Sequence, residues 1–196
     1  MDLDSAIAVI AVGYTQKIDL GEVNGLPFFN VASLGLSAEL AESLTSDVKR
    51  RFGVLGYAFT ALRVLASARP FRAWITAGGA TKRVFTFQVA VGNGRYYGGG
   101  MAVEKDAAID DRMLDLYSLE LKQAWKLAFM APSFRRGEHG AWQEVRAMRG
   151  GAFEVRTRRP RPVNADGEIV TQTPARFTLL PGAVTVFVPE APSTSA

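Results

Sequence analysis

The stretch RVFTFQVAVGNGRYYGGGM, residues 83–101, has an alternating apolar pattern that ends in a run of glycines. The alternation predicts a strand over residues 83–91 with one apolar face, formed by Phe85, Phe87, Val89 and Val91. Three successive glycines then allow the main chain to approach another surface closely, and these are Gly98, Gly99 and Gly100. That surface is a ligand, a partner domain or a neighbouring strand, and the glycines alone do not distinguish among the three.

The composition is that of a chain with a substantial apolar core. The chain has 196 residues, of which 48% are hydrophobic, and this predicts a single domain over residues 1–189 with a disordered tail over 190–196. Its apolar run at residues 6–13 is far shorter than a membrane-spanning helix, which needs about 20 residues. Because Asp2 and Asp4 precede that run and cysteine is absent, we expect a cytoplasmic protein rather than a secreted one.

Strand and turn signals outnumber helix signals along the chain. Asn24-Gly25 between two apolar runs predicts a hairpin, and Pro27 predicts that its second strand lies at a sheet edge. Helices are expected at residues 4–12, 52–68 and 122–130, and further strands at 71–76, 113–119, 153–157, 175–180 and 183–188. About eight strands with short connections predict a mainly β (α+β) fold, an antiparallel β-sandwich with two or three flanking helices.

Four segments resemble, in the same order, the second half of bacterial diacylglycerol kinases, the YegS-like lipid kinases. These segments are FFNVASLGLSAEL (28–40), NGRYYGGGM (93–101), AAIDDRMLDLY (107–117), and DGE (166–168) followed by TPARFTLLPGAVTVFVP (173–189). The resemblance implies a kinase that transfers the γ-phosphate of ATP to a lipid hydroxyl, with its site between an N-terminal nucleotide-binding domain and a C-terminal β-sandwich. The Gly-Gly-Asp-Gly and Gly-Thr-Gly-Asn strings of that first domain are missing here, so we expect this chain alone to be inactive.

The resemblance assigns the role of proton acceptor from the lipid hydroxyl to Glu168. Asp166 would orient Glu168 or hold a metal ion through water. If the chain is extended here, residues two apart project to the same side, and both carboxylates are expected to face one cleft. The residues by themselves favour another interpretation, in which residues 164–167 form a polar hairpin turn.

The resemblance also implies a Mg²⁺ site at a second acidic turn. Asp111 aligns with a Mg²⁺-binding aspartate, and the backbone carbonyls of Ala108 and Met113 would complete the protein's share of the ligands. Arg112 stands where the family usually has glycine, and its charge would weaken ion binding if it pointed towards the ion. Without the resemblance, this segment is an ordinary solvated turn.

The same resemblance places the loop around the glycine triplet at the interdomain cleft. Asn93, Arg95 and Tyr96 are therefore expected to line the substrate site or the domain interface, together with Gly98, Gly99 and Gly100. Asn30 and Ser33 are further cleft candidates. On spacing alone, the aromatic pair could instead cover the open end of the sandwich, and the polar residues could be ordinary strand ends.

The net charge of +4 favours an anionic partner. The basic run RTRRPRP at residues 156–162 predicts peripheral contact with anionic lipid headgroups, although it could also be a solvent-facing strand. Nucleic acid is not expected, because no aromatic side chains alternate with the arginines. The expected partners are a lipid substrate, an N-terminal nucleotide-binding domain and, through bare sheet edges, a second copy. The alternatives are a non-catalytic lipid-binding or interaction module, and a kinase for a soluble nucleotide such as NAD, which shares only the architecture.

Overall fold

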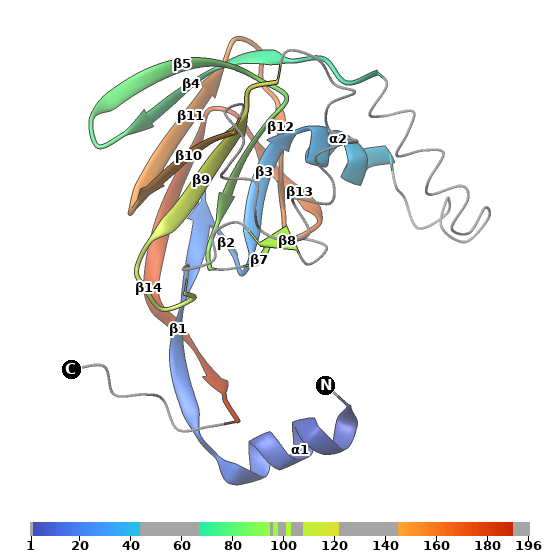
Figure 1. Cartoon of the computed structure of the whole chain (residues 1–196), viewed down its shortest axis with the longest axis vertical. Helices are drawn as coiled ribbons and strands as arrows, with labels where there is room; N and C mark the ends of the chain where they lie inside the picture. Colours follow the sequence, from blue (N-terminus) through green and yellow to red (C-terminus); the bar gives the residue numbers. More distant parts are fainter. Residues whose placement is uncertain are drawn as a thin grey trace.

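A computed structural model gives the fold of the chain and describes residues 2–43, 67–94, 96–97, 101–102, 108–121 and 145–189. Within these ranges two helices, α1 (Leu3–Val12) and α2 (Leu36–Ser43), accompany fourteen strands. Twelve of the strands form two six-stranded sheets that face each other (Figure 1). The remaining two, β7 (Tyr96–Tyr97) and β8 (Met101–Ala102), form a small separate pair.

The two large sheets are antiparallel throughout. The first sheet has the order β2 (Leu26–Phe28), β1 (Thr15–Val23), β14 (Ala175–Phe187), β11 (Ala152–Thr157), β4 (Phe71–Ala77) and β5 (Ala80–Thr86). The second has the order β10 (Val145–Gly150), β9 (Leu114–Leu119), β6 (Gln88–Gly92), β3 (Val31–Gly35), β12 (Pro162–Ala165) and β13 (Glu168–Gln172). Every strand pairing within each sheet is antiparallel, which confirms the predicted antiparallel β-sandwich.

The main apolar core lies between the two sheets. Phe28, Phe153 and Phe177 come from the first sheet and pack against Leu34 and Leu116 of the second. Each of these aromatic side chains is almost completely buried, and burial of that extent contributes about 2 kcal/mol per side chain. A smaller buried cluster lies on the other face of the second sheet, so the central strands of that sheet are buried on both faces.

Several predicted elements are confirmed. Helix α1 matches the expected helix at residues 4–12, and Asn24-Gly25 forms the two-residue turn between β1 and β2 with positive φ at both positions. β2 carries Pro27 and is an edge strand, as predicted. The predicted strands at 71–76, 113–119 and 153–157 correspond to β4, β9 and β11. The helices expected at 52–68 and 122–130 fall almost entirely outside the described residues, as does the tail at 190–196.

The single strand predicted over residues 83–91 is wrong, because the chain changes sheets within it. β5 ends at Thr86 in the first sheet, and β6 begins at Gln88 in the second. Val84, and not Phe85, therefore faces the core from β5, and Phe85 is 55% exposed. Phe87 joins the outer cluster, while Val89 and Val91 belong to the main core. When the chain passes from one sheet to the other, the alternation of core-facing and outward-facing side chains begins anew. A single alternating pattern therefore does not describe both β5 and β6.

Other elements were not anticipated from the sequence. Helix α2 and the strands β3 and β10 had no predicted counterpart. The strands β12 and β13 flank the hairpin turn that the residues alone favoured at 164–167. The strands expected at 175–180 and 183–188 are a single strand, β14. Its pairing with β1 is irregular between Ile18 and Leu20, where the residues around Gly182 form a bulge opposite one residue of β1.

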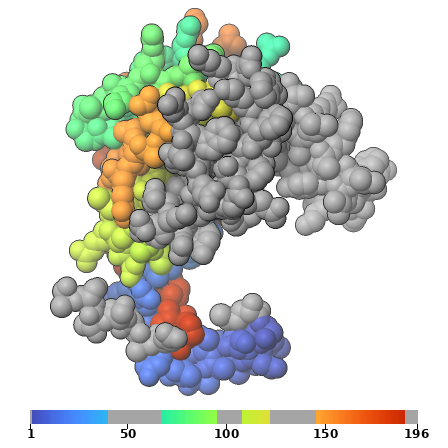
Figure 2. All heavy atoms as spheres, viewed as in Figure 1, coloured from blue at the N-terminus to red at the C-terminus, as the bar shows by residue number. Residues whose placement is uncertain are grey.

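Beyond this bulge, β1 and β14 leave the sandwich as a two-stranded ribbon that leads to α1 (Figure 1). Asp2 caps α1 by accepting a hydrogen bond from the Ser5 amide, and this bond lowers the pKa of the Asp2 carboxyl. No residue of α1 is buried, and Leu3, Ile7 and Ile10 are all more than half exposed. Figure 2 shows α1 and the far end of β14 standing away from the rest of the described chain. Among the described helices, none is long and apolar enough to span a membrane.

Candidate active site

The pairing of the second sheet brings several candidate residues to one end of the sandwich. Val31 pairs with Gly92, Gly92 pairs with Asp115, and Ala32 pairs with Ala165. The chain just before β3, just after β6, just before β9 and just after β12 therefore meets at the same end. We call this the site end and define it by residues 29–30, 93–94, 108–113 and 166–168.

The segment that carries Asp166 is the turn of the β12–β13 hairpin. Asp166 has a φ of 48° and Gly167 a φ of 105°, as a two-residue hairpin turn of this hand requires. The expected extended backbone at residues 166–168 is therefore wrong, so the alternation of an extended chain does not place Asp166 and Glu168 on one side. Aspartate and glycine tolerate positive φ better than most residues, which explains why this dipeptide forms a turn.

The carboxylate of Asp166 fixes the neighbouring turn between β2 and β3. Its Oδ2 accepts a hydrogen bond from the amide of Phe29 at 2.6 Å, and its Oδ1 accepts from the amides of Asn30 and Val31, both at 3.0 Å. The Asp166 amide in turn donates to the carbonyl of Val31 at 3.0 Å. Asp166 thus anchors one turn to another through four hydrogen bonds.

Glu168 has a different environment from Asp166. It is the first residue of β13 and is exposed, and within the described part of the chain its carboxylate has no hydrogen bond or ion pair. The turn before it is held by Asn164, whose side-chain oxygen accepts a hydrogen bond from the Gly167 amide at 3.1 Å. The Nδ2 atom of Asn164 is buried and has no acceptor among the described residues. Glu168 therefore has a carboxylate without a partner among the described residues, and it directly follows a fixed turn.

Asn93 joins three segments at the site end. It is buried at the end of β6, and its Nδ2 donates to the carbonyls of Asp19 at 2.8 Å and Phe29 at 3.2 Å. Its own amide donates to the carbonyl of Asn30 at 2.8 Å. The amides of Phe29 and Asn30 also donate to Asp166. Asn93 and the Asp166 turn are therefore both hydrogen-bonded to residues 29–30. This places two of the predicted site segments side by side.

Asp19 is a functional candidate that the sequence reasoning missed. It lies on β1 opposite the bulge of β14 and is only 4% exposed. Its Oδ1 accepts a hydrogen bond from the Gly182 amide at 2.7 Å, and its Oδ2 accepts one from the Arg112 amide at 2.8 Å. Its own amide donates to the carbonyl of Ile109 at 2.9 Å. The available signal was a single acid between the buried apolar residues Ile18 and Leu20.

The turn before β9 is held by Asp111 and by an unusual backbone conformation at Arg112. Arg112 has a φ of 59°, so it adopts the left-handed conformation that favours glycine. The carboxylate of Asp111 accepts hydrogen bonds from the amides of Ala108 at 3.0 Å and Met113 at 2.9 Å, and it also forms an ion pair with Arg149. Arg149 lies on β10 and comes within 3.8 Å of Asp115 as well.

These contacts bear on the predicted Mg²⁺ site. The Asp111 carboxylate already has three donors, one of them a guanidinium cation that a metal ion would have to displace. The described residues contain no group of three or more histidine, cysteine, aspartate or glutamate side chains placed to hold a metal ion. A divalent ion at this turn would therefore have to compete with the Arg149 guanidinium, and Mg²⁺ binding by Asp111 stays a prediction.

The remaining sequence candidates are placed only in part. Asn30 is exposed at the site end, and the Ser33 hydroxyl is buried and accepts a hydrogen bond from Ser37 at 2.8 Å. Tyr96 lies in β7 opposite Ala102. Outside the described residues lie Arg95, Gly98, Gly99 and Gly100. Away from the site end, a hydrogen bond from Arg146 to Glu120 raises the pKa of Arg146.

Comparison with known proteins identifies relatives of this chain. The family model described as the YegS C-terminal NAD kinase beta sandwich-like domain matches residues 30–188. A "Probable lipid kinase YegS-like" from Pseudomonas fluorescens is 31% identical over 175 residues, which is 89% of this chain and 58% of that protein. The "Diacylglycerol kinase" of Bacillus subtilis is 28% identical over 191 residues, which is 96% of this chain and 62% of that protein.

A solved structure shares the fold. The crystal structure of a putative diacylglycerol kinase from Bacillus anthracis superposes with a TM-score of 0.73 at 24% sequence identity, covering 91% of this chain and 58% of that one. The likeness extends over both sheets of the sandwich. This chain therefore spans about three fifths of the length of the relatives that it matches.

Proposed function

Because the chain belongs to the family of YegS C-terminal NAD kinase beta sandwich-like domains, we propose that it is the half of a lipid kinase that binds the acceptor substrate. The relatives of the chain are named lipid kinases and a diacylglycerol kinase. The reaction would transfer the γ-phosphate of ATP to the hydroxyl of a lipid such as diacylglycerol. Transfer to an alcohol needs a base close to the hydroxyl and a fixed geometry around it.

The observation that carries this proposal is the contrast between the two acids of the β12–β13 turn. Asp166 uses its carboxylate to hold the backbone of residues 29–31, whereas Glu168 projects from the same turn without a partner in the described chain. We assign Glu168 as the base that takes the proton from the lipid hydroxyl, and Asp166 as a positioning residue. Asn93 and Asp19 would keep the surrounding turns in place.

A nucleotide-binding partner domain is part of the proposal. The relatives are longer than this chain. The side of α1 that carries Leu3, Ile7 and Ile10 is exposed and packs against nothing in the described structure. Such a surface supports packing against another domain. That domain would bind most of the ATP, so we expect this chain alone to lack activity. Dimerisation and peripheral contact with an anionic membrane remain predictions.

The test is a Glu168→Gln substitution in a protein that contains both the nucleotide-binding domain and this sandwich. Removing a base of this kind lowers kcat by about 10²–10⁴-fold. The measurement is transfer of labelled phosphate from ATP to diacylglycerol in mixed micelles, with thermal unfolding recorded in parallel. Glu154→Gln on β11, a partly exposed glutamate far from the turn, is the matched control and should retain activity.

Full activity in the Glu168→Gln protein would remove the assigned base. Failure of the unsubstituted two-domain protein to phosphorylate any hydroxylated lipid, while it still binds lipid, would instead favour the non-catalytic lipid-binding module. The two results are distinguishable because the first requires an active parent protein and the second requires an inactive one.

A further inference from the structure

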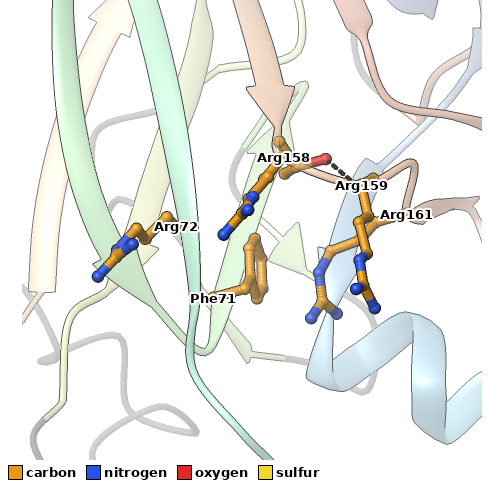
Figure 3. Close-up of a pocket in the computed structure, with 6 residues that line it drawn as sticks. Phe71, Arg72, Arg158, Arg159 and Arg161 are labelled. Atoms are coloured by element: carbon orange, nitrogen blue, oxygen red, sulfur yellow. Dashed lines mark hydrogen bonds between the residues drawn. The ribbon is translucent and has the colours of Figure 1, made fainter.

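A basic pocket lies at the end of the sandwich opposite the site end. Pro162 and Gln172 form the far pair of the β12–β13 hairpin, whereas Ala165 and Glu168 form the pair next to the Asp166 turn. The pocket has a volume of about 230 Å³ and is lined by Phe71, Arg72, Thr157, Arg158, Arg159 and Arg161 (Figure 3). It is therefore separate from the proposed phosphoryl-transfer site.

The loop that supplies most of these arginines is held in one conformation by hydrogen bonds. The Thr157 hydroxyl donates to the carbonyl of Arg159 at 2.7 Å. The Arg161 amide donates to the Thr173 hydroxyl, and the Thr173 amide donates back to the Arg161 carbonyl, both at 2.9 Å. The loop backbone at residues 157–161 is thus ordered before any ligand binds, which reduces the entropy lost on binding.

The arginines do not all have the same role. The Arg161 guanidinium lies 4.1 Å from the centroid of the Phe71 ring and is 3.3 Å from the Glu39 carboxylate, so it is held in place. Arg158 and Arg159 form no ion pair with any carboxylate of the described chain. Figure 3 shows Arg158 on one side of the Phe71 ring and Arg159 and Arg161 on the other, while Arg72 points away. Of these three guanidinium groups, only that of Arg161 has a carboxylate partner among the described residues.

We propose that this pocket binds a phosphate group. Guanidinium groups bind phosphate oxygens through paired, charge-assisted hydrogen bonds, and three of them around a fixed loop supply more positive charge than Glu39 neutralises. The phosphate can belong to the headgroup of an anionic lipid or to free phosphate. The inference goes beyond the proposed kinase function, because it assigns a second ligand site that takes no part in phosphoryl transfer.

The first arm of the test uses inorganic phosphate. In the intact protein with ¹⁵N-labelled arginine, addition of phosphate should move the Nε–H signals of Arg158, Arg159 and Arg161 with a common saturation curve, and chloride at equal ionic strength should not. The variant Arg158→Ala/Arg159→Ala should abolish the remaining Arg161 shift. The control Arg156→Ala/Arg176→Ala removes two exposed cations outside the pocket and should leave the shifts unchanged.

The second arm uses vesicles of phosphatidylcholine, with or without phosphatidic acid, in a sedimentation assay. Each cation near an anionic surface contributes about 5-fold to binding, so the Arg158→Ala/Arg159→Ala protein should bind about 30-fold more weakly to vesicles with phosphatidic acid. The Arg156→Ala/Arg176→Ala protein should lose much less affinity for these vesicles. Far-ultraviolet circular dichroism confirms folding, and Arg158→Gln/Arg159→Gln replaces the alanine variant if that variant unfolds.

The outcomes separate the two sources of phosphate and can overturn the proposal. Saturable shifts with inorganic phosphate and no vesicle binding identify free phosphate, and pocket-dependent binding to vesicles alone identifies a lipid headgroup. An equal loss of vesicle affinity in the two double variants would show that binding depends only on general surface charge. This result would overturn the proposed phosphate site. The proposal also fails if neither probe affects Arg158, Arg159 or Arg161.

Discussion

Replacing Asp166 with asparagine separates a structural role of this residue from a chemical one. Asparagine also tolerates positive φ, so the turn conformation at Asp166 is preserved. One side-chain oxygen remains and can still accept from Asn30 and Val31, but the amide group that replaces Oδ2 faces the Phe29 amide, which is itself a donor. The substitution removes one hydrogen bond and the charge assistance of the other two.

The size of the effect follows from the exposure of the three amides. The Phe29 and Asn30 bonds are exposed, so their amides can bind water instead, whereas the Val31 bond is partly buried. We expect Asp166→Asn to lower the free energy of unfolding by about 1.5 kcal/mol, and Asp166→Ala by about 3 kcal/mol, because alanine also disfavours the left-handed conformation. With a urea m-value of about 2 kcal/mol/M, the midpoint for Asp166→Asn falls by about 0.7 M.

Urea unfolding followed by tryptophan fluorescence measures these changes. Asp110→Asn is the matched control, because Asp110 is also an exposed aspartate at the site end, and within the described part of the chain it accepts a hydrogen bond from the Gln16 side chain alone. Its effect should be below about 0.5 kcal/mol, as for an exposed single hydrogen bond. If Asp166→Asn is as stable as the parent protein, the carboxylate does not anchor residues 29–31. If Asp166→Asn does not change the stability but abolishes the activity of the two-domain enzyme that carries it, Asp166 takes part in the chemistry.

Three further substitutions test other parts of the structure. Asp19→Ala leaves two amides without their buried acceptor and should cost about 3 kcal/mol in urea unfolding; a loss below about 1 kcal/mol would show that Asp19 does not hold the bulge. Gly35→Ala places a Cβ 2.3 Å from the Phe87 carbonyl oxygen at a residue with a φ of 94°. The urea midpoint should therefore fall by the equivalent of about 3 kcal/mol, and an unchanged midpoint would contradict this close packing. Arg149→Gln removes the cation beside Asp111, so Mn²⁺ affinity measured by electron paramagnetic resonance should rise about 5-fold, and equal affinities would show that Arg149 does not compete with metal.

Local signals predicted the parts of the fold that depend on neighbouring residues. The Asn24-Gly25 turn and the edge position of β2 follow from the backbone preferences of asparagine, glycine and proline. The sandwich follows from repeated short apolar strands with short connections. The face of β5 could not be derived in this way, because the chain crosses between sheets at Phe87, and that crossing depends on tertiary contacts with Leu119 and Leu36.

The sequence named candidate site residues but did not give their arrangement. The resemblance identified Asp166, Glu168, Asn93 and Asn30, and the pairing of the second sheet brings all four to the site end. Asp19 was missed because its partners, Gly182 and Arg112, are far away in the sequence, and only the folded chain brings them together. The expected extended segment at 166–168 failed because the local preference of Asp-Gly for a turn decided the backbone.

The hydrogen bonds at the site end give the two acids of the β12–β13 turn different capacities. The carboxylate of Asp166 accepts three amide hydrogen bonds, so taking a proton from a substrate would weaken the bonds that hold the β2–β3 turn. Glu168 can change its protonation state without breaking any contact within the described chain. Under the proposed function, repeated proton transfer therefore falls to Glu168, while Asp166 keeps the turn in position through each cycle.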